Sequence, residues 1–410
     1  MRFCLVTQHH LCNNPRLVKE ADTLTAAGHD VRVVWLDARA DLRARDDELL
    51  ATRRWRATPV AAERVGLRGQ IGWLWDGVRR EAARRMHDAG LRIRRLAEES
   101  LERRPRALER AVRAAPADVV VAHTLGALPP AARAARALGA RVVFDAEDLH
   151  VGELPDDAAH AGARARVAEV ERYYLPRCDR VVASSDGIAD ALRQAYGLVR
   201  PRVVLNAFAL PPLRSDGAAR SGEPARLYWF SQVVGPDRGI QTALDAMALL
   251  GDGTEIYLRG EARPELMREL RSHATALGLD ERVHLLPIVS PDELPALSAQ
   301  FDVGLALETG SSENRALCVT NKLLTYLAAG LAVAATDTPG QRGVMEQAPA
   351  AGFLFPAGDA VALAAGLRAL VSDPARLASA KQASRAAAEQ RFSWEHERER
   401  LLEALTNWAE

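Results

Sequence analysis

Short runs of β-branched residues alternate along this chain with alanine-rich stretches of helical character. The first unit reads RFCLVTQ, then PRLVKEADTLTAAGHD, then VRVVWL, with Pro15 at a helix start and Gly28 at its end. Similar strand-like runs return as DVVVAHTL, RVVFDAED, RVVASS and RVVLNA. Strand and helix repeated in this way predict an α/β protein with a parallel sheet covered by helices on both faces.

The alternation stops once and then restarts. From Asn206 to Pro224 the chain contains PP, SDG and SGEP and lacks apolar periodicity, and the strand-like runs RLYWFS, EIYLRG, RVHLLPI, VGLALE and LAVAATD follow. A chain of 410 residues also exceeds what one hydrophobic core usually organises. We therefore expect two doubly wound, Rossmann-like domains over residues 1–207 and 225–392, joined by a linker over 208–224.

Composition excludes several classes of protein. The chain has 54 basic and 54 acidic residues, so no global field attracts it to nucleic acid. Its four cysteines show no metal-ligand spacing and no disulfide framework, which predicts no metal site and a reducing compartment. The amino-terminal apolar run is too short for a signal peptide, and Gly330 interrupts the longest apolar run. We expect a cytoplasmic protein.

One segment, residues 51–115, departs from this rhythm with 17 arginines against 8 acidic residues, and it also holds Trp55, Trp73 and Trp75. It predicts one or two amphipathic helices inserted in the first domain. The simplest interpretation is a solvated helical face. The functional alternative is peripheral contact with anionic headgroups at the inner membrane face, or with a lipid-linked acceptor. Nucleic acid binding is disfavoured by the neutral charge of the whole chain.

The turn after VGLALE is the most informative one, because ligands of doubly wound sheets lie outside the carboxyl ends of the strands. This turn leads into a helix that begins near Thr320 and ends near Gly330. A helix amino terminus offers unpaired N–H groups and a positive dipole end, which suit a diphosphate. Lys322 lies in that first turn, where a nearby anion would explain it; the alternative is a solvated lysine. Glu313, just ahead, can accept hydrogen bonds from sugar hydroxyls.

A second turn follows RLYWFS and reads QVVGPDRGIQTALDAM. Arg238 opens the next helix there and can hold a phosphate oxygen, although a surface arginine is the alternative. No GxGxxG follows a first strand in either half of the chain, which disfavours a dinucleotide-dependent oxidoreductase.

Polar residues also end strands of the first domain. His123 ends DVVVAH, where a histidine is as often a buried structural group as a catalytic one. Further residues follow the runs RVVFDA and RFCLVT and could contact an acceptor or the donor, or simply cap a loop. These candidates are Glu147, Asp148 and His150 after the former run, and His9, His10, Asn13 and Asn14 after the latter.

Several of these motifs resemble glycosyltransferase family 4 (glycosyl transferases group 1). The string TNKLLTYLAAGLAVAATDTPGQ is similar to the family's NK-helix, which ends in YLAAG before a strand. Further similarities lie in GPDRGIQTALDAM, NPRLVKEADTLTAAGHDVRVV, SSDGIADAL and FSWEHERERLLEAL. The resemblance covers nearly the whole chain outside the arginine-rich segment. It implies a GT-B fold, in which two Rossmann-like domains face each other across a cleft and the last helix, residues 393–410, crosses back to the first domain.

The resemblance also implies roles for single residues. Arg238 and Lys322 match the family's two basic phosphate ligands, and the amides of Thr320, Asn321 and Lys322 match its phosphate-facing helix start. Pro287 and Ile288 occupy the loop whose backbone faces the base of the donor.

Two further residues match the family's sugar-binding groups, and one departs from its pattern. His123 resembles the histidine that lines the acceptor side of the reacting sugar, and Glu313 resembles the first glutamate of a paired motif that contacts that sugar. Thr325 stands where the second glutamate, a ribose ligand, is expected, and a hydroxyl cannot replace a carboxylate that accepts two hydrogen bonds. Glu308 and Glu346 are the alternative ribose ligands.

The implied function is a retaining hexosyl transfer from a nucleoside-diphosphate sugar to an acceptor hydroxyl, in glycan, glycolipid or natural-product biosynthesis. No cofactor or metal is implied, because basic residues and the helix start stabilise the leaving diphosphate. Two alternatives remain open at this point: a nucleotide-sugar epimerase or phosphorylase on the same fold, and a noncatalytic nucleotide-sugar-binding protein.

Overall fold

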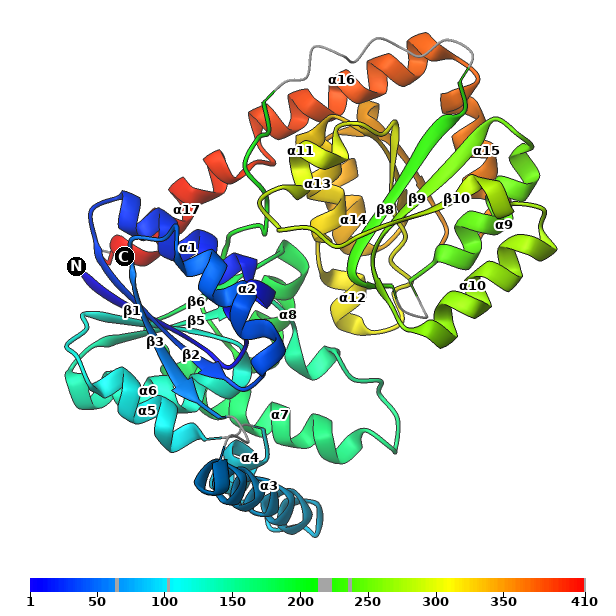
Figure 1. Cartoon of the computed structure of the whole chain (residues 1–410). Coiled ribbons are helices and arrows are strands. Elements are labelled where there is room, and N and C mark those ends of the chain that lie inside the picture. The colour runs from blue at the N-terminus through cyan, green and yellow to red at the C-terminus, as the bar shows by residue number, and fades with distance from the viewer. Residues whose placement is uncertain (63–65, 102–103, 213–222, 235–237, 409–410) are drawn as a thin grey trace. The chain divides into compact units, whose positions relative to one another are not determined.

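The computed structural model describes residues 1–62, 66–101, 104–212, 223–234 and 238–408. It divides into two compact units (Figure 1). Unit 1 comprises Met1–Val204 together with Arg398–Glu410, and unit 2 comprises Leu205–Glu397. Each unit is built around one sheet of parallel strands.

The sheet of unit 1 has seven strands in the order β3-β2-β1-β4-β5-β6-β7. Their bounds are β1 (Arg2–Thr7), β2 (Asp30–Asp37), β3 (Arg56–Ala61), β4 (Val119–His123), β5 (Arg141–Ala146), β6 (Arg180–Ala183) and β7 (Arg202–Val203). Every neighbouring pair is parallel. The strand order reverses between β1 and β4, and such a switch point is where open α/β sheets bind ligands.

The sheet of unit 2 has six strands in the order β10-β9-β8-β11-β12-β13, again all parallel. Their bounds are β8 (Ala225–Val234), β9 (Thr254–Ala262), β10 (Val283–Leu286), β11 (Val303–Ala306), β12 (Ala332–Thr336) and β13 (Gly352–Phe355). Its switch point lies between β8 and β11. The predicted pair of doubly wound, Rossmann-like domains is therefore confirmed.

Helices connect the strands in both units. Those of unit 1 are α1 (Pro15–Ala26), α2 (Ala40–Leu50), α3 (Gly66–Asp88), α4 (Arg94–Leu101), α5 (Pro105–Arg113), α6 (Leu128–Leu138), α7 (Ala161–Tyr174) and α8 (Asp186–Tyr196). Those of unit 2 are α9 (Ile240–Leu250), α10 (Pro264–Ala276), α11 (Leu294–Ser298), α12 (Glu313–Leu317), α13 (Asn321–Ala329), α14 (Pro339–Met345), α15 (Ala360–Val371) and α16 (Pro374–Gln390). Over the described residues, no helix combines the length and apolarity needed to cross a bilayer.

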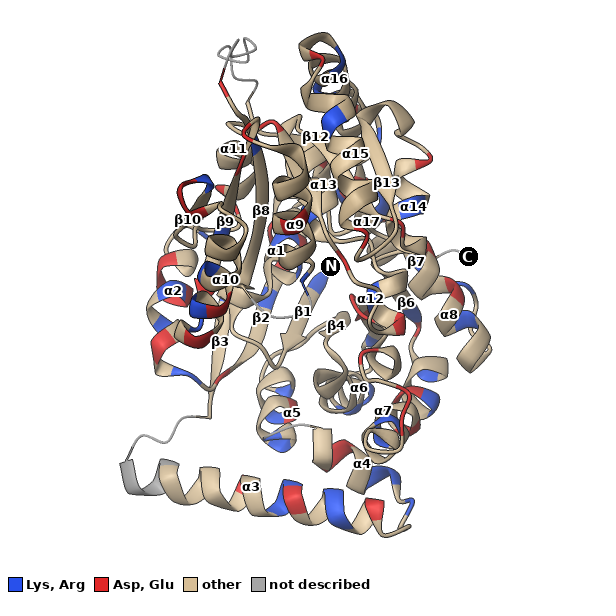
Figure 2. Ribbon diagram, turned by 90° about the vertical axis from the view of Figure 1, so that its right-hand side faces the viewer, with Lys and Arg blue, Asp and Glu red and all other residues tan. Residues whose placement is uncertain are grey.

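The arginine-rich segment differs from the expected inserted helices. Residues 56–61 form β3, which pairs with β2 and belongs to the sheet, and α5 packs beside it through the buried Leu108 and Val112. The prediction missed β3 because it is an edge strand, in which only Val60 is buried, so it lacks the apolar run of an interior strand. The inserted part is thus α3 and α4, which contact each other apart from the sheet (Figure 2).

The final helix, α17 (Trp394–Thr406), connects the two units. It begins in unit 2, where the Trp394 N–H donates to the Phe208 carbonyl at 2.9 Å. It ends in unit 1, where Arg180 donates to the carbonyls of Ala404 and Asn407. Residues 213–222 of the expected linker lie outside the described residues.

Aromatic rings fill one face of the sheet in unit 2 and leave room for a glycine alone. Tyr228 stacks on Phe301 with ring centroids 4.2 Å apart, and Tyr326 of α13 meets Phe230 edge-on. Gly304 of β11 lies against the Tyr326 ring, and a Cβ added at Gly304 would be 2.2 Å from its Cγ. The packing of α13 against the sheet therefore requires a residue without a side chain at position 304.

We expect Gly304→Ala to destabilise the protein by about 1–3 kcal/mol, because the added methyl group must displace a buried ring. The matched control is Gly343→Ala in α14, where a Cβ meets nothing within 4 Å and alanine favours the helix. Thermal unfolding should show a lower midpoint for the first variant alone. Equal midpoints for the two variants would contradict this packing.

Candidate functional site

A buried ion pair joins the end of β11 to the start of α13. Lys322, the second residue of α13, places its Nζ 2.7 Å from Oε1 of Glu308, and both side chains are buried. The Thr320 hydroxyl donates to the same carboxylate oxygen at 3.2 Å. The interpretation of Lys322 as a solvated lysine is therefore wrong, since the lysine is enclosed and paired.

Three cations act on the Glu308 carboxylate in the described part of the chain. Burial raises the pKa of Glu308, but the charges of Lys322, Arg238 and Arg315 outweigh it and hold the pKa at about 2. Burial lowers the pKa of Arg238, and the charge of Arg315 lowers it further. Lys322 and Arg238 thus both act on one carboxylate among the described residues, and a bound anion would relieve the repulsion between the two guanidinium groups.

The start of α13 adds to this positive cluster. Thr320 occupies the N-cap position, but its hydroxyl donates to Glu308 instead of capping the helix. The N–H groups of the first turn, including those of Asn321 and Lys322, have no earlier helical turn to bond to, and the positive end of the helix dipole lies there. The structure thus brings Arg238, Thr320, Asn321 and Lys322 together beside the switch point of unit 2, an arrangement that could hold an anion.

Other residues predicted for unit 2 lie outside this cluster. Glu313 is exposed, at the first residue of the short helix α12. Pro287 follows β10, and its carbonyl accepts a hydrogen bond from Arg259 at 2.8 Å, while Ile288 beside it is half-buried. Glu346, one alternative ribose ligand, is exposed at the end of α14.

Thr325 is fully buried within α13. Its hydroxyl donates to the Asn321 carbonyl one turn earlier, at 2.8 Å. The side chain at the position where the resemblance implies a ribose-binding glutamate therefore makes its hydrogen bond within the helix. Of the two alternative ribose ligands, Glu308 is the one that lies beside Lys322 and Arg238.

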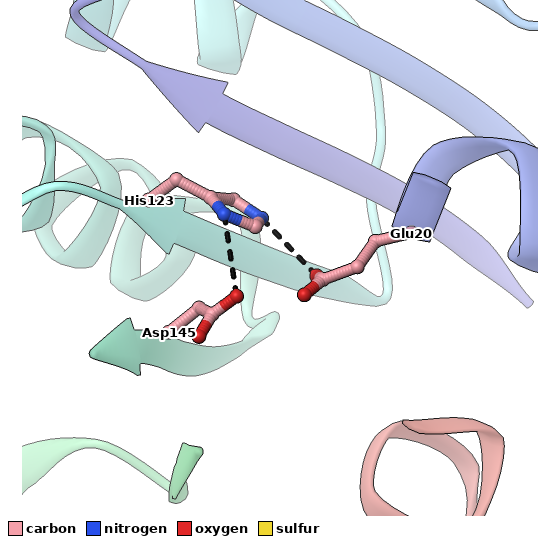
Figure 3. Close-up of side chains that lie close together, drawn as sticks. All are labelled: Glu20, His123 and Asp145. Atoms are coloured by element: carbon pink, nitrogen blue, oxygen red, sulfur yellow. Dashed lines mark ion pairs between the residues drawn. The ribbon is translucent and has the colours of Figure 1, made fainter. Parts of the chain in front are cut away.

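Unit 1 has a buried charge cluster of its own beside its switch point (Figure 3). His123 ends β4, with its Nε2 3.2 Å from Oε2 of Glu20 on α1 and its Nδ1 3.4 Å from Oδ2 of Asp145 in β5. Arg16, one turn before Glu20, donates from Nε to Asp145 at 2.7 Å and from Nη1 to the Val204 carbonyl at 2.8 Å. All four charged side chains are buried.

Proton affinities in this cluster are set by burial and by the neighbouring charges. Burial raises the pKa of Glu20 to about 7, and the charge of Asp145 adds to the rise. Burial lowers the pKa of His123, but Glu20 and Asp145 outweigh it and raise that pKa above its ordinary value. Burial also raises the pKa of Asp145, yet Arg16 and His123 hold it at about 2. The neighbouring charges therefore favour the charged form of His123, while burial favours the protonated form of Glu20.

The same three side chains, Glu20, His123 and Asp145, have donor atoms close enough to share a metal ion. Arg16 argues against that use, because its buried guanidinium already lies 2.7 Å from Asp145 and 3.4 Å from Glu20. A divalent cation would be placed beside a permanent positive charge. The chemistry of the donor set therefore fits an ion-paired network around His123 better than a metal centre.

Sequence reasoning identified His123 but missed its partners. Arg16 and Glu20 are four residues apart on α1, so they share a helix face, and Asp145 is a charge inside an apolar strand. Charged residues in such positions are rarely fully buried unless paired. Their sequence positions therefore indicated that these charges are paired. Which histidine they surround depends on the tertiary fold.

The loop after β1 corrects two of the acceptor-side candidates. His10 is buried, with Nδ1 2.6 Å from Asp46 and Nε2 accepting from the Ala38 and Arg39 N–H groups. Asn14 caps α1 by accepting from the Leu17 N–H and donates to Thr7. These side chains hold the loop in place, so predicting them as ligand contacts was wrong. Asn13 is exposed.

The remaining candidates of unit 1 influence one another electrostatically near the ends of β1 and β5. Burial lowers the pKa of His9, and the charge of His150 lowers it further. Burial also lowers the pKa of His150, but Glu153, Glu171 and Asp148 outweigh it and raise that pKa. Burial, then the charge of Asp148, raises the pKa of Glu147 to about 7.

A strained residue lies beside these groups. Thr124 directly follows His123 and has φ 74° and ψ 145°, a backbone conformation that costs a non-glycine residue of order 1–3 kcal/mol. Strain of this kind concentrates at binding and catalytic positions. It makes the carboxyl end of β4 a candidate functional edge of unit 1.

Comparison with known proteins identifies the family. The family model described as glycosyl transferases group 1 matches residues 224–373, and the model of the glycosyl transferase 4-like domain matches residues 14–208. The chain is a GT-B glycosyltransferase of the family 4 type. D-inositol 3-phosphate glycosyltransferase of Rhodococcus opacus (strain B4) is 36% identical to this glycosyltransferase over 278 residues. That match covers 62% of the chain and 58% of the relative's own length.

Solved structures share the fold of this glycosyltransferase at low sequence identity. Anabaena HepE, in complex with UDP and glucose, aligns with a TM-score of 0.70 at 19% identity and covers 99% of each chain. Sucrose-phosphate synthase of Thermosynechococcus elongatus aligns with a TM-score of 0.68 at 15% identity, covering 98% of this chain and 97% of its own. Both likenesses agree with the two Rossmann-like domains described above.

The depressed pKa of Glu308 predicts an acid-sensitive contribution to stability. A carboxyl with a pKa of about 2 when folded and about 4.3 when unfolded stabilises the protein fully above the unfolded value. That contribution, about 3 kcal/mol, is lost as the pH falls toward 2. Denaturant unfolding between pH 6 and pH 3 should therefore show a steeper loss for the parent than for Glu308→Gln.

The exposed Glu346→Gln is the matched control and should follow the parent over the same range. Equal acid sensitivity of the parent and Glu308→Gln would show that the buried pair does not hold this carboxyl ionised.

Proposed function

We propose that this glycosyltransferase moves a sugar from a nucleoside-diphosphate donor to an acceptor hydroxyl, with retention at the anomeric carbon. The observation that carries the proposal is the placement of both Lys322 and Arg238 around Glu308, beside the start of α13. Such an arrangement suits a group that gains negative charge as its bond to the sugar breaks. The complexes of HepE with UDP and with UDP-glucose support a nucleoside diphosphate as that group.

Binding of the diphosphate would change the partners of Lys322. In the described part of the chain its ammonium lies 2.7 Å from Glu308 and over the Trp229 ring, 5.6 Å from the ring centroid, and an ammonium has three donors. A phosphate oxygen can therefore share Lys322 with Glu308, while Arg238 and the first N–H groups of α13 hold other oxygens. The carboxylate keeps the lysine in position before the donor arrives. We propose that this protein charge suffices and that neither a metal nor another cofactor is required.

The acceptor proton has a direct route in this proposal. An oxygen of the leaving diphosphate accepts it as the acceptor oxygen attacks the anomeric carbon from the same side, so the protein supplies no nucleophile. Glu313 accepts hydrogen bonds from the hydroxyls of the transferred sugar. His123, fixed between Glu20 and Asp145, acts as a positioning group for the acceptor side of that sugar.

The acceptor is lipid-linked in our proposal, and the protein works at the cytoplasmic face of a membrane. The basis is the arginine surplus of residues 51–115, whose helices α3 and α4 are additional to the sheet-covering layers of unit 1. His9, Glu147, Asp148 and His150, near the strand ends of unit 1, are the groups proposed to meet its hydroxyl.

Nucleotide-induced thermal stabilisation tests the donor site. Saturating UDP should raise the unfolding midpoint of the parent, and Lys322→Ala and Arg238→Ala should each bind UDP roughly 10- to 100-fold more weakly, because each removes a charge-assisted hydrogen bond. Lys381→Ala is the matched control, since Lys381 pairs with Asp302 elsewhere in unit 2. If all four proteins respond equally to UDP, the phosphate assignment is wrong.

A second readout tests the reaction itself. The anomeric configuration of the product, followed by ¹H NMR, should match that of the donor, and an inverted product would contradict retention. Epimerisation of the donor without an acceptor, or turnover that needs free phosphate, would replace the transferase by an epimerase or a phosphorylase. Tight UDP binding without turnover of any donor would indicate a noncatalytic nucleotide-sugar-binding protein.

A further inference from the structure

Helix α3 presents an apolar face to solvent. Ile71, Leu74, Trp75 and Val78 are spaced as residues i, i+3, i+4 and i+7, so they lie on one side of the helix. Their exposed fractions are 48%, 60%, 68% and 53%. Met86, two turns beyond Val78 on the same side, is 44% exposed. We call these five side chains the α3 stripe.

The opposite side of α3 is the one that packs against the protein. Ala83 and His87 are buried, and His87 lies 2.7 Å from Glu169 of α7. Asp88 pairs with Arg166 of α7, and Arg79 pairs with Glu99 of α4. The helix is therefore fixed in orientation by polar contacts. Its amphipathicity is the reverse of that of an ordinary surface helix, whose apolar side faces the core.

Charge distinguishes the partners that such a stripe can meet. Residues 51–115 hold 17 arginines against 8 acidic residues in a chain balanced at 54 to 54, so the rest of the chain has the opposite excess. A second copy docked stripe to stripe would bring two arginine-rich segments together. A nucleic acid would find an apolar stripe instead of a basic one. An anionic lipid surface complements both features, because its acyl boundary accepts apolar side chains and its headgroups attract arginine.

An exposed arginine on the stripe side of α3 can contact lipid headgroups. Arg85 lies seven residues after Val78, on the stripe side of α3, and its side chain is 76% exposed although it also contacts Glu81. Figure 2 shows α3 as a long helix whose charged positions lie along its carboxyl-terminal half, beyond a tan stretch. A long arginine side chain beside an apolar stripe can reach headgroups while its stem follows the acyl boundary.

We propose that α3 lies flat in the interface of an anionic bilayer and inserts the α3 stripe, with Trp75 at the level of the headgroups. Helix α3 would then be the element that makes the proposed membrane contact. The lipid-linked acceptor itself rests on the proposed function. The surface that attracts the protein would then also present its acceptor.

Vesicle flotation tests the inserted element. The probes are vesicles of phosphatidylcholine alone and vesicles with about one third phosphatidylglycerol, a fraction chosen for a strongly negative surface potential. We expect the parent to bind the anionic vesicles at least tenfold more tightly, and the double variant Leu74→Ser, Trp75→Ser to lose at least tenfold of that binding, because two exposed apolar anchors are removed.

The matched control is Val199→Ser, Val361→Ser, which also removes two exposed apolar side chains, 95% and 69% exposed, outside α3. It should bind like the parent. Equal binding of the parent and the stripe variant, or equal binding to both vesicle types, would overturn the proposal. So would a dimer, detected by light scattering, that the stripe variant converts to a monomer, because the stripe would then be covered by a second copy.

The donor site provides the independent readout. UDP should stabilise the stripe variant as much as it stabilises the parent, because α3 belongs to unit 1, whereas Lys322 and Arg238 belong to unit 2. Loss of vesicle binding with unchanged UDP stabilisation supports the stripe proposal. If the parent binds anionic vesicles, the stripe variant does not, and neither protein responds to UDP, the proposed function is rejected while the α3 stripe proposal is retained.

Discussion

The buried pair between Lys322 and Glu308 is the interaction on which the candidate donor site depends. Burying two charges is expensive, and a buried ion pair is often no more stable than an apolar pair of the same volume. Here the pair does something that an apolar pair cannot do. It holds an ammonium at the start of α13, engages the N-cap hydroxyl of Thr320, and gives Arg238 and Arg315 a shared counter-charge.

The same principle governs unit 1. His123 lies at the end of a central strand, beside one cation, Arg16, and two carboxyl groups, those of Glu20 and Asp145. Both clusters sit beside the switch point of their own sheet, where neighbouring strand connections diverge and leave room for a ligand. Each unit therefore has a charge cluster beside its switch point, with Lys322, Glu308 and Arg238 in unit 2 and His123 and its three charged neighbours in unit 1.

Local patterns predicted the architecture well, because they depend on residues close in sequence. The alternation of strands and helices indicated both sheets, and the α13 boundary near Thr320 and Gly330 followed from the helix pattern and the left-handed glycine at its end. Partners distant in sequence were beyond reach: Glu20 for His123, Asp46 for His10 and Glu308 for Lys322. The edge strand β3 was missed for a related reason, since only its pairing with β2 makes it a strand.

A crystal structure of the protein with bound UDP would test the assignment of the donor phosphates most directly. We expect diphosphate oxygens within hydrogen-bonding distance of Lys322 Nζ and of the first N–H groups of α13, with the Glu308 carboxylate still beside the lysine. Arg238 should contact the same diphosphate. A structure in which UDP binds elsewhere, while Lys322 contacts Glu308 alone, would contradict the central claim.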